Sequence, residues 1–155
     1  MVKLRSYRFE DQGAVVAIWW DSWHSIRPGL RHPQPFADWR ARWAGEIAPT
    51  QAIVVAEDDG AVVGFAAADV AARVLSQIFV APRHKRHGIG CELLGWAQEL
   101  MPEGFSLHTL VDNLASRAFY DRHGLVEGDR GTNPINGMEI IEYHWMPRAS
   151  RTARV

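Results

Sequence analysis

Apolar and polar residues along the chain follow two periods, one typical of strands and the other of helices. Alternating or β-branched apolar runs predict strands, and apolar residues three or four positions apart predict amphipathic helices. Helices are expected around residues 14–19, 36–47, 90–100 and 115–123. Strands are expected at residues 2–9, 52–57, 61–69, 74–80, 106–111, 125–130 and 138–145.

Residues 58–60 (DDG) carry the clearest turn signal, between the second and third expected strands. Asp-Gly pairs favour tight hairpin turns because both residues adopt positive φ readily. We therefore expect residues 52–57 and 61–69 to pair antiparallel. Together with the helices, this pattern predicts a single mixed α/β domain over residues 1–146.

The composition is that of an ordinary globular chain. Among 155 residues, 17 Lys and Arg stand against 18 Asp and Glu, and 47% of the residues are hydrophobic. This balance argues against disorder and against a dedicated basic nucleic-acid binder. The first residues lack the pattern of a secretory signal, and no apolar run is long enough to span a membrane, so we expect no membrane partner.

Cys91 is the only cysteine of the chain. It permits neither an internal disulfide nor a cysteine-built zinc site, which favours a reducing compartment, and we expect a cytoplasmic protein. An unreactive position on a helix face is the simplest interpretation of Cys91, and the alternative is a nucleophilic thiol at the start of a helix. Residues 147–155 carry three arginines and little that can pack, so we expect them to form a flexible basic tail.

Residues 80–90 (VAPRHKRHGIG) leave an expected strand, pass through a basic segment and enter an expected helix at two glycines. Glycines let backbone N–H groups approach a ligand closely, and the N-terminus of a helix attracts negative charge. The segment therefore predicts a site for phosphate or pyrophosphate. The alternative is a tight turn whose cations are merely solvated.

Two common phosphate-binding motifs do not fit this segment. Leu93 occupies the third glycine position of G-x-G-x-x-G, and Gly-Lys-Ser/Thr is absent from the chain. The segment instead resembles the acyl-CoA-binding turn of the GNAT acetyltransferase superfamily, Gln/Arg-x-x-Gly-x-Gly/Ala after a Val-x-Pro strand end. Lys85 stands where the family usually has Gln or Arg, which keeps the charge but loses the planar fork of arginine.

Residues 107–125 (LHTLVDNLASRAFYDRHGL) resemble another part of the same superfamily, a strand followed by Asn, Ala, Phe-Tyr and Gly-Phe, with Leu125 in place of the final Phe. The resemblance implies a central mixed, splayed sheet of six or seven strands flanked by about four helices, with CoA between the fourth and fifth strands. It also implies transfer of an acetyl group from acetyl-CoA to a small-molecule or peptide amine. The cofactor-binding residues that it implies are Phe79, Val80, Lys85, Arg86, His87, Gly88, Ile89, Gly90 and Asn113.

Tyr120 matches the general acid of the family, whose phenol would protonate the departing thiolate. The alternative is that Phe119 and Tyr120 form an aromatic pair that packs the helix on the sheet. Asn113 would bind the cofactor or cap the last helix, because Asn is a preferred N-cap residue. For Val80, the alternative is an ordinary core valine.

The sequence does not identify the general base. The family often uses a carboxylate on the fourth strand, where this chain has Gln77, an amide that cannot accept a proton at neutral pH. Another group or a water chain must then take the proton of the amine. The candidate residues are Asp69, Glu139, Glu142, His24 and His108.

Five of the seven tryptophans lie in the two amino-terminal helices. Trp20, Trp23 and His24 fall partly outside the apolar stripe of their helix, and we expect them to form a wall of the acceptor pocket. Aromatic faces suit cations and apolar substrate bodies. His84 and His87 lie in the loop assigned to phosphate, and no other pair of histidines shows metal-ligand spacing on a helix. We therefore expect no metal.

An N-acetyltransferase is the leading functional hypothesis. The alternative from another class is a non-catalytic module that binds acyl-CoA or another anion and has lost its base, as Gln77 suggests. A nucleic-acid-binding domain that uses the basic turn and tail is a more distant hypothesis, and we expect no nucleic-acid partner. The sequence leaves the acceptor and the oligomeric state open, with a homodimer among the options.

Overall fold

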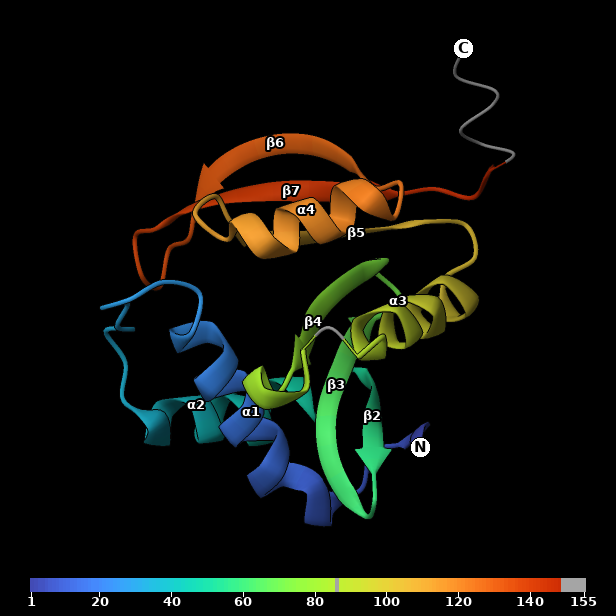
Figure 1. The fold of residues 1–155 in the computed structure, drawn as a ribbon. Coiled ribbons are helices and arrows are strands. Elements are labelled where there is room, and N and C mark those ends of the chain that lie inside the picture. Colours follow the sequence, from blue (N-terminus) through green and yellow to red (C-terminus); the bar gives the residue numbers. More distant parts are fainter. Residues whose placement is uncertain (86, 149–155) are drawn as a thin grey trace.

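A computed structural model describes residues 1–85 and 87–148 of the chain. The expected cofactor-binding residue Arg86 and residues 149–155 of the expected tail lie outside the described residues. The described part is a mixed sheet with helices on both faces (Figure 1). Within that part, no helix is both long and apolar enough to cross a membrane.

The sheet contains seven strands in the order β1-β2-β3-β4-β5-β7-β6, which confirms the predicted mixed sheet. Neighbouring strands are antiparallel except β4 and β5, which run parallel. The strands are β1 (Val2–Ser6), β2 (Ala52–Asp58), β3 (Ala61–Asp69), β4 (Val74–Val80), β5 (Phe105–Leu110), β6 (Val126–Thr132) and β7 (Glu139–Trp145).

The helices bury apolar side chains against both faces of the sheet. We call the buried residues under α1 and α2 the α1–α2 core, which includes Trp19, Trp43 and Phe65. The α3–α4 core on the other face includes Leu93 and Tyr143. The helices are α1 (Gln12–His24), α2 (Phe36–Arg42), α3 (Ile89–Leu100) and α4 (Leu114–Arg122), with short helical turns η1 (Phe9–Asp11), η2 (Trp43–Ile47) and η3 (Pro82–His84).

The strands β4 and β5 separate almost immediately after they meet. Their ladder consists of one register pair, Val74 with Ser106, and the Ser106 amide donates to the Arg73 carbonyl at 3.0 Å. A bulge at the Ala67/Ala68 register step also bends the β3–β4 pair at this point. The sheet is therefore splayed between β4 and β5, as predicted.

The hairpin of β2 and β3 forms at the predicted turn, where Asp59 and Gly60 have φ of 51° and 79°. In contrast, β1 ends at Ser6, three residues before the predicted end of the first strand. The Asp11 carboxylate accepts a hydrogen bond from the Arg8 amide at 2.8 Å, which turns the chain into η1 before α1 begins.

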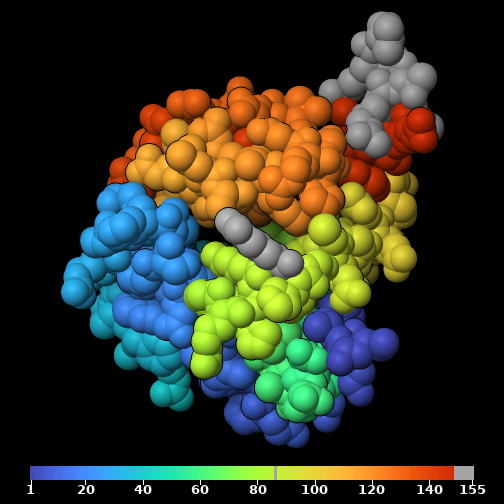
Figure 2. All heavy atoms as spheres, in the orientation of Figure 1, coloured from blue at the N-terminus to red at the C-terminus, as the bar shows by residue number. Residues whose placement is uncertain are grey.

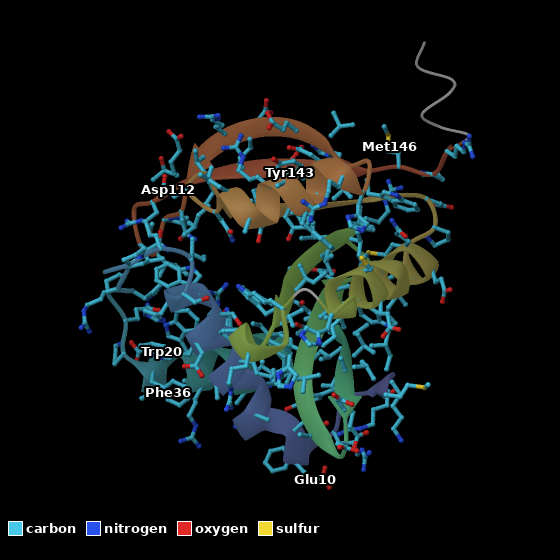
Figure 3. All side chains as sticks on the ribbon, viewed as in Figure 1. Glu10, Trp20, Phe36, Asp112, Tyr143 and Met146 are labelled. Carbon is cyan, nitrogen blue, oxygen red and sulfur yellow. The ribbon has the colours of Figure 1, made fainter. Side chains whose placement is uncertain are left out.

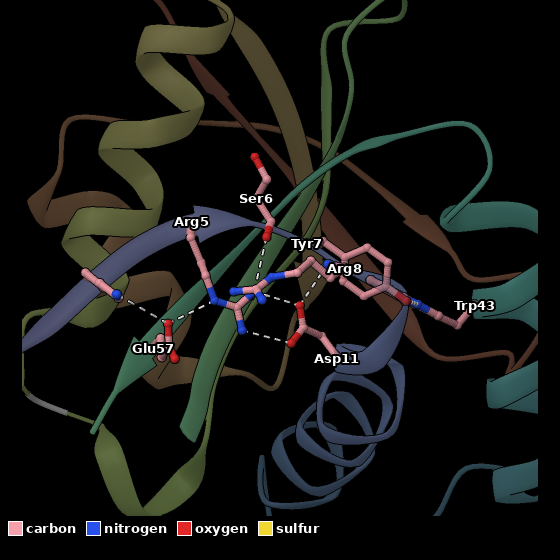
Figure 4. A network of polar contacts seen from close by, with 8 residues as sticks. Arg5, Ser6, Tyr7, Arg8, Asp11, Trp43 and Glu57 are labelled. Atoms are coloured by element: carbon pink, nitrogen blue, oxygen red, sulfur yellow. Dashed lines mark hydrogen bonds and ion pairs between the residues drawn. The ribbon is translucent and has the colours of Figure 1, made fainter. Parts of the chain in front are cut away.

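Arg5 ties this turn to the sheet (Figure 4). Its guanidinium donates to both carboxylate oxygens of Asp11, at 2.8 and 2.9 Å, and to Glu57 of β2 at 2.9 Å. Nearby, the fully buried Trp43 donates its indole N–H to the Tyr7 hydroxyl at 3.0 Å. Polar contacts thus fix the first turn of the chain against β2 and the end of α2.

Candidate active site

A cavity of about 940 Å³ occupies the gap between β4 and β5. Residues 75–80 of β4 and 107–110 of β5 line it. Beyond the Val74–Ser106 pair, these strand edges face each other without a shared ladder, so their backbone groups border the cavity. In the space-filling view, the surface of α4 meets the surface around the start of α3 along a seam, with the α1–α2 side next to both (Figure 2).

The cavity reaches both faces of the sheet. On β4, Ile78 and Val80 pack against the α3–α4 core, whereas Phe79 packs against the α1–α2 core. On β5, Leu107 belongs to the α3–α4 core and Leu110 to the α1–α2 core. Because all five residues line the cavity, it connects an α3–α4 end with an α1–α2 end through the splay of the sheet.

The loop between β4 and α3 supplies backbone donors at the α3–α4 end. Gly88 is the N-cap of α3 with a φ of 79°, and a Cβ at this position would have no heavy atom within 4 Å. The Glu92 amide donates to the Gly88 carbonyl, and among the described residues the amides of residues 89–91 have no helical partners. Gly88, Ile89 and Gly90 all line the cavity. The backbone of this turn is therefore open at Gly88, which is compatible with the approach of an anion.

Lys85 lies in the same loop and lines the cavity. Partial burial lowers the pKa of its ammonium, and among the described residues it makes no ion pair. His84 also lines the cavity. Its Nδ1 atom is buried and has no hydrogen-bond partner among the described residues. His87 is exposed and is not part of the described lining. An anionic ligand would give Lys85 the partner that the described chain does not.

Three other expected cofactor residues, two at the end of β4 and one at the N-cap of α4, make structural contacts. The Val80 carbonyl accepts a hydrogen bond from the buried Ser22 hydroxyl at 2.8 Å, which connects β4 to α1. Phe79 stacks on Phe65 with ring centroids 5.8 Å apart. Asn113 caps α4, because its Oδ1 accepts from the Ser116 amide at 3.2 Å. Val80, Phe79 and Asn113 nevertheless all line the cavity.

Tyr120 lines the cavity from α4 and is 5% exposed. Its ring lies 5.3 Å from that of Tyr143 and 5.6 Å from that of Phe119, so the predicted aromatic contact exists. Burial, with a smaller effect of Tyr143, raises the pKa of the Tyr120 phenol. Its hydroxyl has no hydrogen-bond partner within the described chain. The phenol therefore stays protonated and retains a free donor.

The structure separates the candidate bases. Asp69 accepts from the Ala72 amide at 3.1 Å and Glu139 pairs with Arg130 at 3.3 Å, and neither is in the described lining. His24 uses both ring nitrogens: Nδ1 donates to the Trp20 carbonyl at 2.7 Å and Nε2 accepts from the His32 amide at 3.2 Å. These three groups stabilise local structure.

His108 and Glu142 come together. They face each other in the β5–β7 register, and Glu142 Oε2 lies 3.4 Å from His108 Nε2. The other Glu142 oxygen contacts His144. His108 lines the cavity, as does Gln77. The imidazole is thus the only candidate base in the described lining, and it has a carboxylate beside it.

Aromatic side chains line the α1–α2 end. Trp23 is among them, together with Trp19, Trp39 and His32. Trp20 and His24 are not in the described lining: they contact Trp39, with ring centroids 5.1 and 5.7 Å from it. Trp20 also contacts Phe36, on the outer side of the two helices (Figure 3).

His32 was not indicated by the sequence. It lies between helices in a proline-rich connection without periodicity, and its ring contacts Trp39 and Trp23 at 4.9 and 5.1 Å. Its Nδ1 accepts from the Gln34 amide, and burial, followed by the nearby His24 and Arg42, lowers its pKa. In the described residues, no three His, Cys, Asp or Glu side chains gather as metal ligands.

Several solved structures share this architecture. A GCN5-related N-acetyltransferase from Rhodopseudomonas palustris has a TM-score of 0.76 at 20% identity, over 93% of this chain and 94% of that one. The paiA N-acetyltransferase of Thermoplasma acidophilum, in complex with coenzyme A, has a TM-score of 0.71 at 18% identity, over 94% and 99%. For yncA of Salmonella typhimurium, with its cofactor acetyl-CoA, the TM-score is 0.67 at 15% identity, over 94% and 93%. Identities this low show a common fold and no more. No curated protein matches the chain.

A comparison of sequence alone gives the family. Residues 14–125 match the sequence model of the Acetyltransferase (GNAT) family. The matched segment runs from the start of α1 past the end of α4, so it contains β4, β5 and the loop before α3. It therefore covers most of the chain and most of the cavity lining, including Lys85, Gly88 and Tyr120. By this match and by its splayed sheet, the chain belongs to the acetyltransferase (GNAT) family.

Proposed function

We propose that the protein is a cytoplasmic N-acetyltransferase of one domain, residues 1–146, that transfers an acetyl group from acetyl-CoA to an amine. The observation that carries the proposal is the cavity through the splay, whose lining reaches both faces of the sheet. Two proteins of the same fold contain coenzyme A or acetyl-CoA. Two substrates entering from opposite faces would meet between β4 and β5.

The α3–α4 end suits the cofactor. The open space at Gly88, the amides of residues 89–91 and Lys85 together fit the diphosphate of CoA, because these amides and this ammonium have no partners among the described residues. His87, Asn113 and the edge of β4 at Phe79 and Val80 complete the proposed contacts, with Arg86 from outside the described residues. Acetyl-CoA supplies the acetyl group as a thioester, which an amine attacks to form an amide and release a thiol.

Tyr120 and His108 divide the proton transfers. The Tyr120 phenol, protonated and free to donate, gives its proton to the departing sulfur. Glu142 Oε2 lies 3.4 Å from His108 Nε2, so the proposal places the ring hydrogen on Nε2 and leaves Nδ1 as the acceptor of the amine proton. Glu142 acts as a positioning residue that fixes the ring and its tautomer. Gln77 lies in the same lining and orients the amine or a water molecule.

The α1–α2 end suits the acceptor. Trp19, Trp23 and Trp39 present aromatic faces, which attract cations and cover apolar groups. Burial lowers the pKa of His32, which disfavours a positive charge on this ring. Trp20 and His24 contribute indirectly, because their rings contact Trp39 and hold it in place. We therefore propose an amine with an apolar or aromatic body as the acceptor.

An assay of cofactor choice and turnover tests the proposal. CoA should raise the melting temperature, whereas NAD and ATP should not, and a panel of small amines and peptide amines should release free thiol from acetyl-CoA. Binding of CoA without acetylation of any amine would favour the non-catalytic acyl-CoA-binding module. Absence of CoA binding would exclude both functions, and a steep loss of nucleic-acid binding with salt would favour the basic-surface alternative.

The proposed base has its own test. His108→Gln should lower kcat about a hundred-fold or more while the KM for acetyl-CoA stays constant. Glu142→Gln should lower kcat less, and the double variant should be no slower than His108→Gln alone, because Glu142 acts through His108. Glu139→Gln is the matched control on the same strand and should leave kcat unchanged. Full activity of His108→Gln would assign the base elsewhere.

A further inference from the structure

Cys91 and His123 form a contact that the proposed transfer reaction does not use. Cys91 Sγ lies 3.1 Å from His123 Nε2, although the two residues are 32 positions apart in the chain. Cys91 is exposed at the start of α3, and His123 follows the last residue of α4. Both residues line the α3–α4 end of the cavity.

The hydrogen bonds of His123 define which group holds the proton. Its Nδ1 lies 2.8 Å from the Phe119 carbonyl oxygen, which can only accept, so Nδ1 carries a hydrogen. In the neutral ring, Nε2 is then an acceptor and faces the thiol of Cys91. The Phe119 ring, 4.2 Å from the imidazole, holds it in place. A nucleophile, a base within reach and a group that orients the base form the arrangement of an activated thiol.

The surroundings favour an anion at this position. The amides of residues 89–91 lie at the start of α3 without helical partners in the part of the chain that the structure describes, and Lys85 and Arg122 line the same cavity. Glu92 is the one acidic residue in the first turn of α3, and it is exposed. An anionic reagent that approaches Cys91 is attracted by these groups.

We propose that Cys91 and His123 form a thiol modification site that reacts with small anionic disulfides. His123 Nε2 takes the thiol proton, and Cys91 Sγ attacks one sulfur of the disulfide. A new S–S bond forms to Cys91 while the original S–S bond breaks, and the second sulfur leaves with the electron pair as a thiolate. Cys91 is thereby oxidised and the small disulfide is the oxidant. The adduct occupies the α3–α4 end and excludes CoA, a consequence that rests on the proposed function.

The reactivity test uses dithiobis(nitrobenzoate), an anionic aromatic disulfide that releases a coloured thiolate. Because Cys91 is the only cysteine, the signal reports this site alone. The folded protein should react about ten-fold faster than the same chain unfolded in denaturant at the same pH. His123→Gln and His123→Phe should remove the acceleration, the second while keeping an aromatic ring on Phe119. His87→Gln removes a nearby imidazole that does not contact the thiol, and the fast rate should persist.

Equal rates in the folded and unfolded chains, or a fast rate in both His123 variants, would overturn the proposal. Cys91→Ser should not be labelled. The CoA arm separates the two proposals: CoA should slow labelling, and the labelled protein should lose CoA binding until a reducing agent restores it. If direct measurement shows CoA binding but CoA leaves labelling unchanged, the exclusion of CoA by the adduct is overturned and the proposed function stands. If CoA does not bind at all, the proposed function fails.

Discussion

Tyr120 and Tyr143 are neighbouring phenols with different contacts. Tyr143 is fully buried, its oxygen accepts from Arg117 Nε at 3.3 Å, and its hydroxyl donates to Glu127 at 3.4 Å. The Tyr120 hydroxyl has no partner among the described residues and borders the cavity. At the scale of single residues, this difference separates a structural hydroxyl from one available to a substrate.

Replacement of each phenol by Phe tests that distinction. Tyr120→Phe keeps the ring, so the melting temperature and acetyl-CoA binding should hardly change, whereas kcat should fall roughly ten-fold to ten-thousand-fold. Tyr143→Phe should do the opposite, lowering stability with little effect on kcat. Steady-state kinetics and thermal unfolding of both variants measure this. Unchanged turnover of Tyr120→Phe would show that another group protonates the thiolate.

The residue pattern predicted some members of the site and not others. Lys85, Gly88 and Tyr120 occur in short motifs whose chemistry is local, and all three line the cavity. His108 and Glu142 were separate candidates because only the β5–β7 register brings them together. His32 has no local signal, since its position depends on how a proline-rich connection folds over Trp23 and Trp39.

Among the elements, the turn from β4 into α3 combines local strain with a ligand role. Gly88 and Gly60 have the same φ of 79° and equally open surroundings, but only Gly88 is in the described lining. Alanine at either position is strained to a similar extent. Gly60→Ala is therefore a matched control for the backbone effect.

Gly88→Ala should weaken CoA binding about ten-fold or more, because the methyl group enters the open space at the N-terminus of α3 and shifts its amides. Gly60→Ala should lose similar stability and bind CoA normally. Titration calorimetry with CoA and denaturant unfolding of both variants provide the comparison. Equal CoA affinity in the two variants would remove this turn from the cofactor site.

The junction of β1, η1 and α1 depends on the buried Asp11. Hydrogen bonds from Arg5 are the main cause that lowers the Asp11 pKa, and the Arg8 amide contributes. A lowered pKa in the folded state means that this stabilisation is present above the ordinary carboxyl pKa of about 4 and is lost as the pH falls through the folded value.

Asp11→Asn should lower the free energy of unfolding by about 2 kcal/mol at pH 7, because Arg5 loses its charged partner. The variant should also lose stability less steeply than the parent below about pH 4. Urea unfolding at neutral and acid pH measures both effects. Asp58→Asn, which breaks an exposed pair with the chain amine, is the control and should cost less than about 0.5 kcal/mol. Similar costs for both variants would contradict the structural role of Asp11.

Local sequence signals predicted most of the helices and strands. The features that they did not predict depend on contacts between distant segments. The β2–β3 hairpin, β4 and α3 follow from a turn, a β-branched run and glycines before a helix. The helix expected over residues 36–47 is instead α2 followed by the wider turn η2, where Trp43 reaches the Tyr7 hydroxyl. That contact joins distant segments, so no local period contains it.

At the scale of the whole molecule, one sheet consists of two halves, β1–β4 and β5–β7, that share a single register pair. Strand edges beyond that pair exchange their amide hydrogens with solvent. CoA should slow amide exchange along residues 75–80 and 107–110, where the edges border the cavity, and leave the β2–β3 pairs unchanged. Mass spectrometry of exchanged peptides measures this. Uniform slowing across the sheet would indicate a general gain of stability instead.

The single register pair of Val74 with Ser106 acts as a hinge between the two halves of the sheet. The loop with Lys85 and the tryptophans belong to the β1–β4 half, and Tyr120 and His108 belong to the β5–β7 half. The angle between the two halves therefore sets how far the cofactor and the acceptor lie from the proposed acid and base. A bound CoA molecule that contacts both halves would fix this angle. Binding of acetyl-CoA would then align the groups that act on the amine.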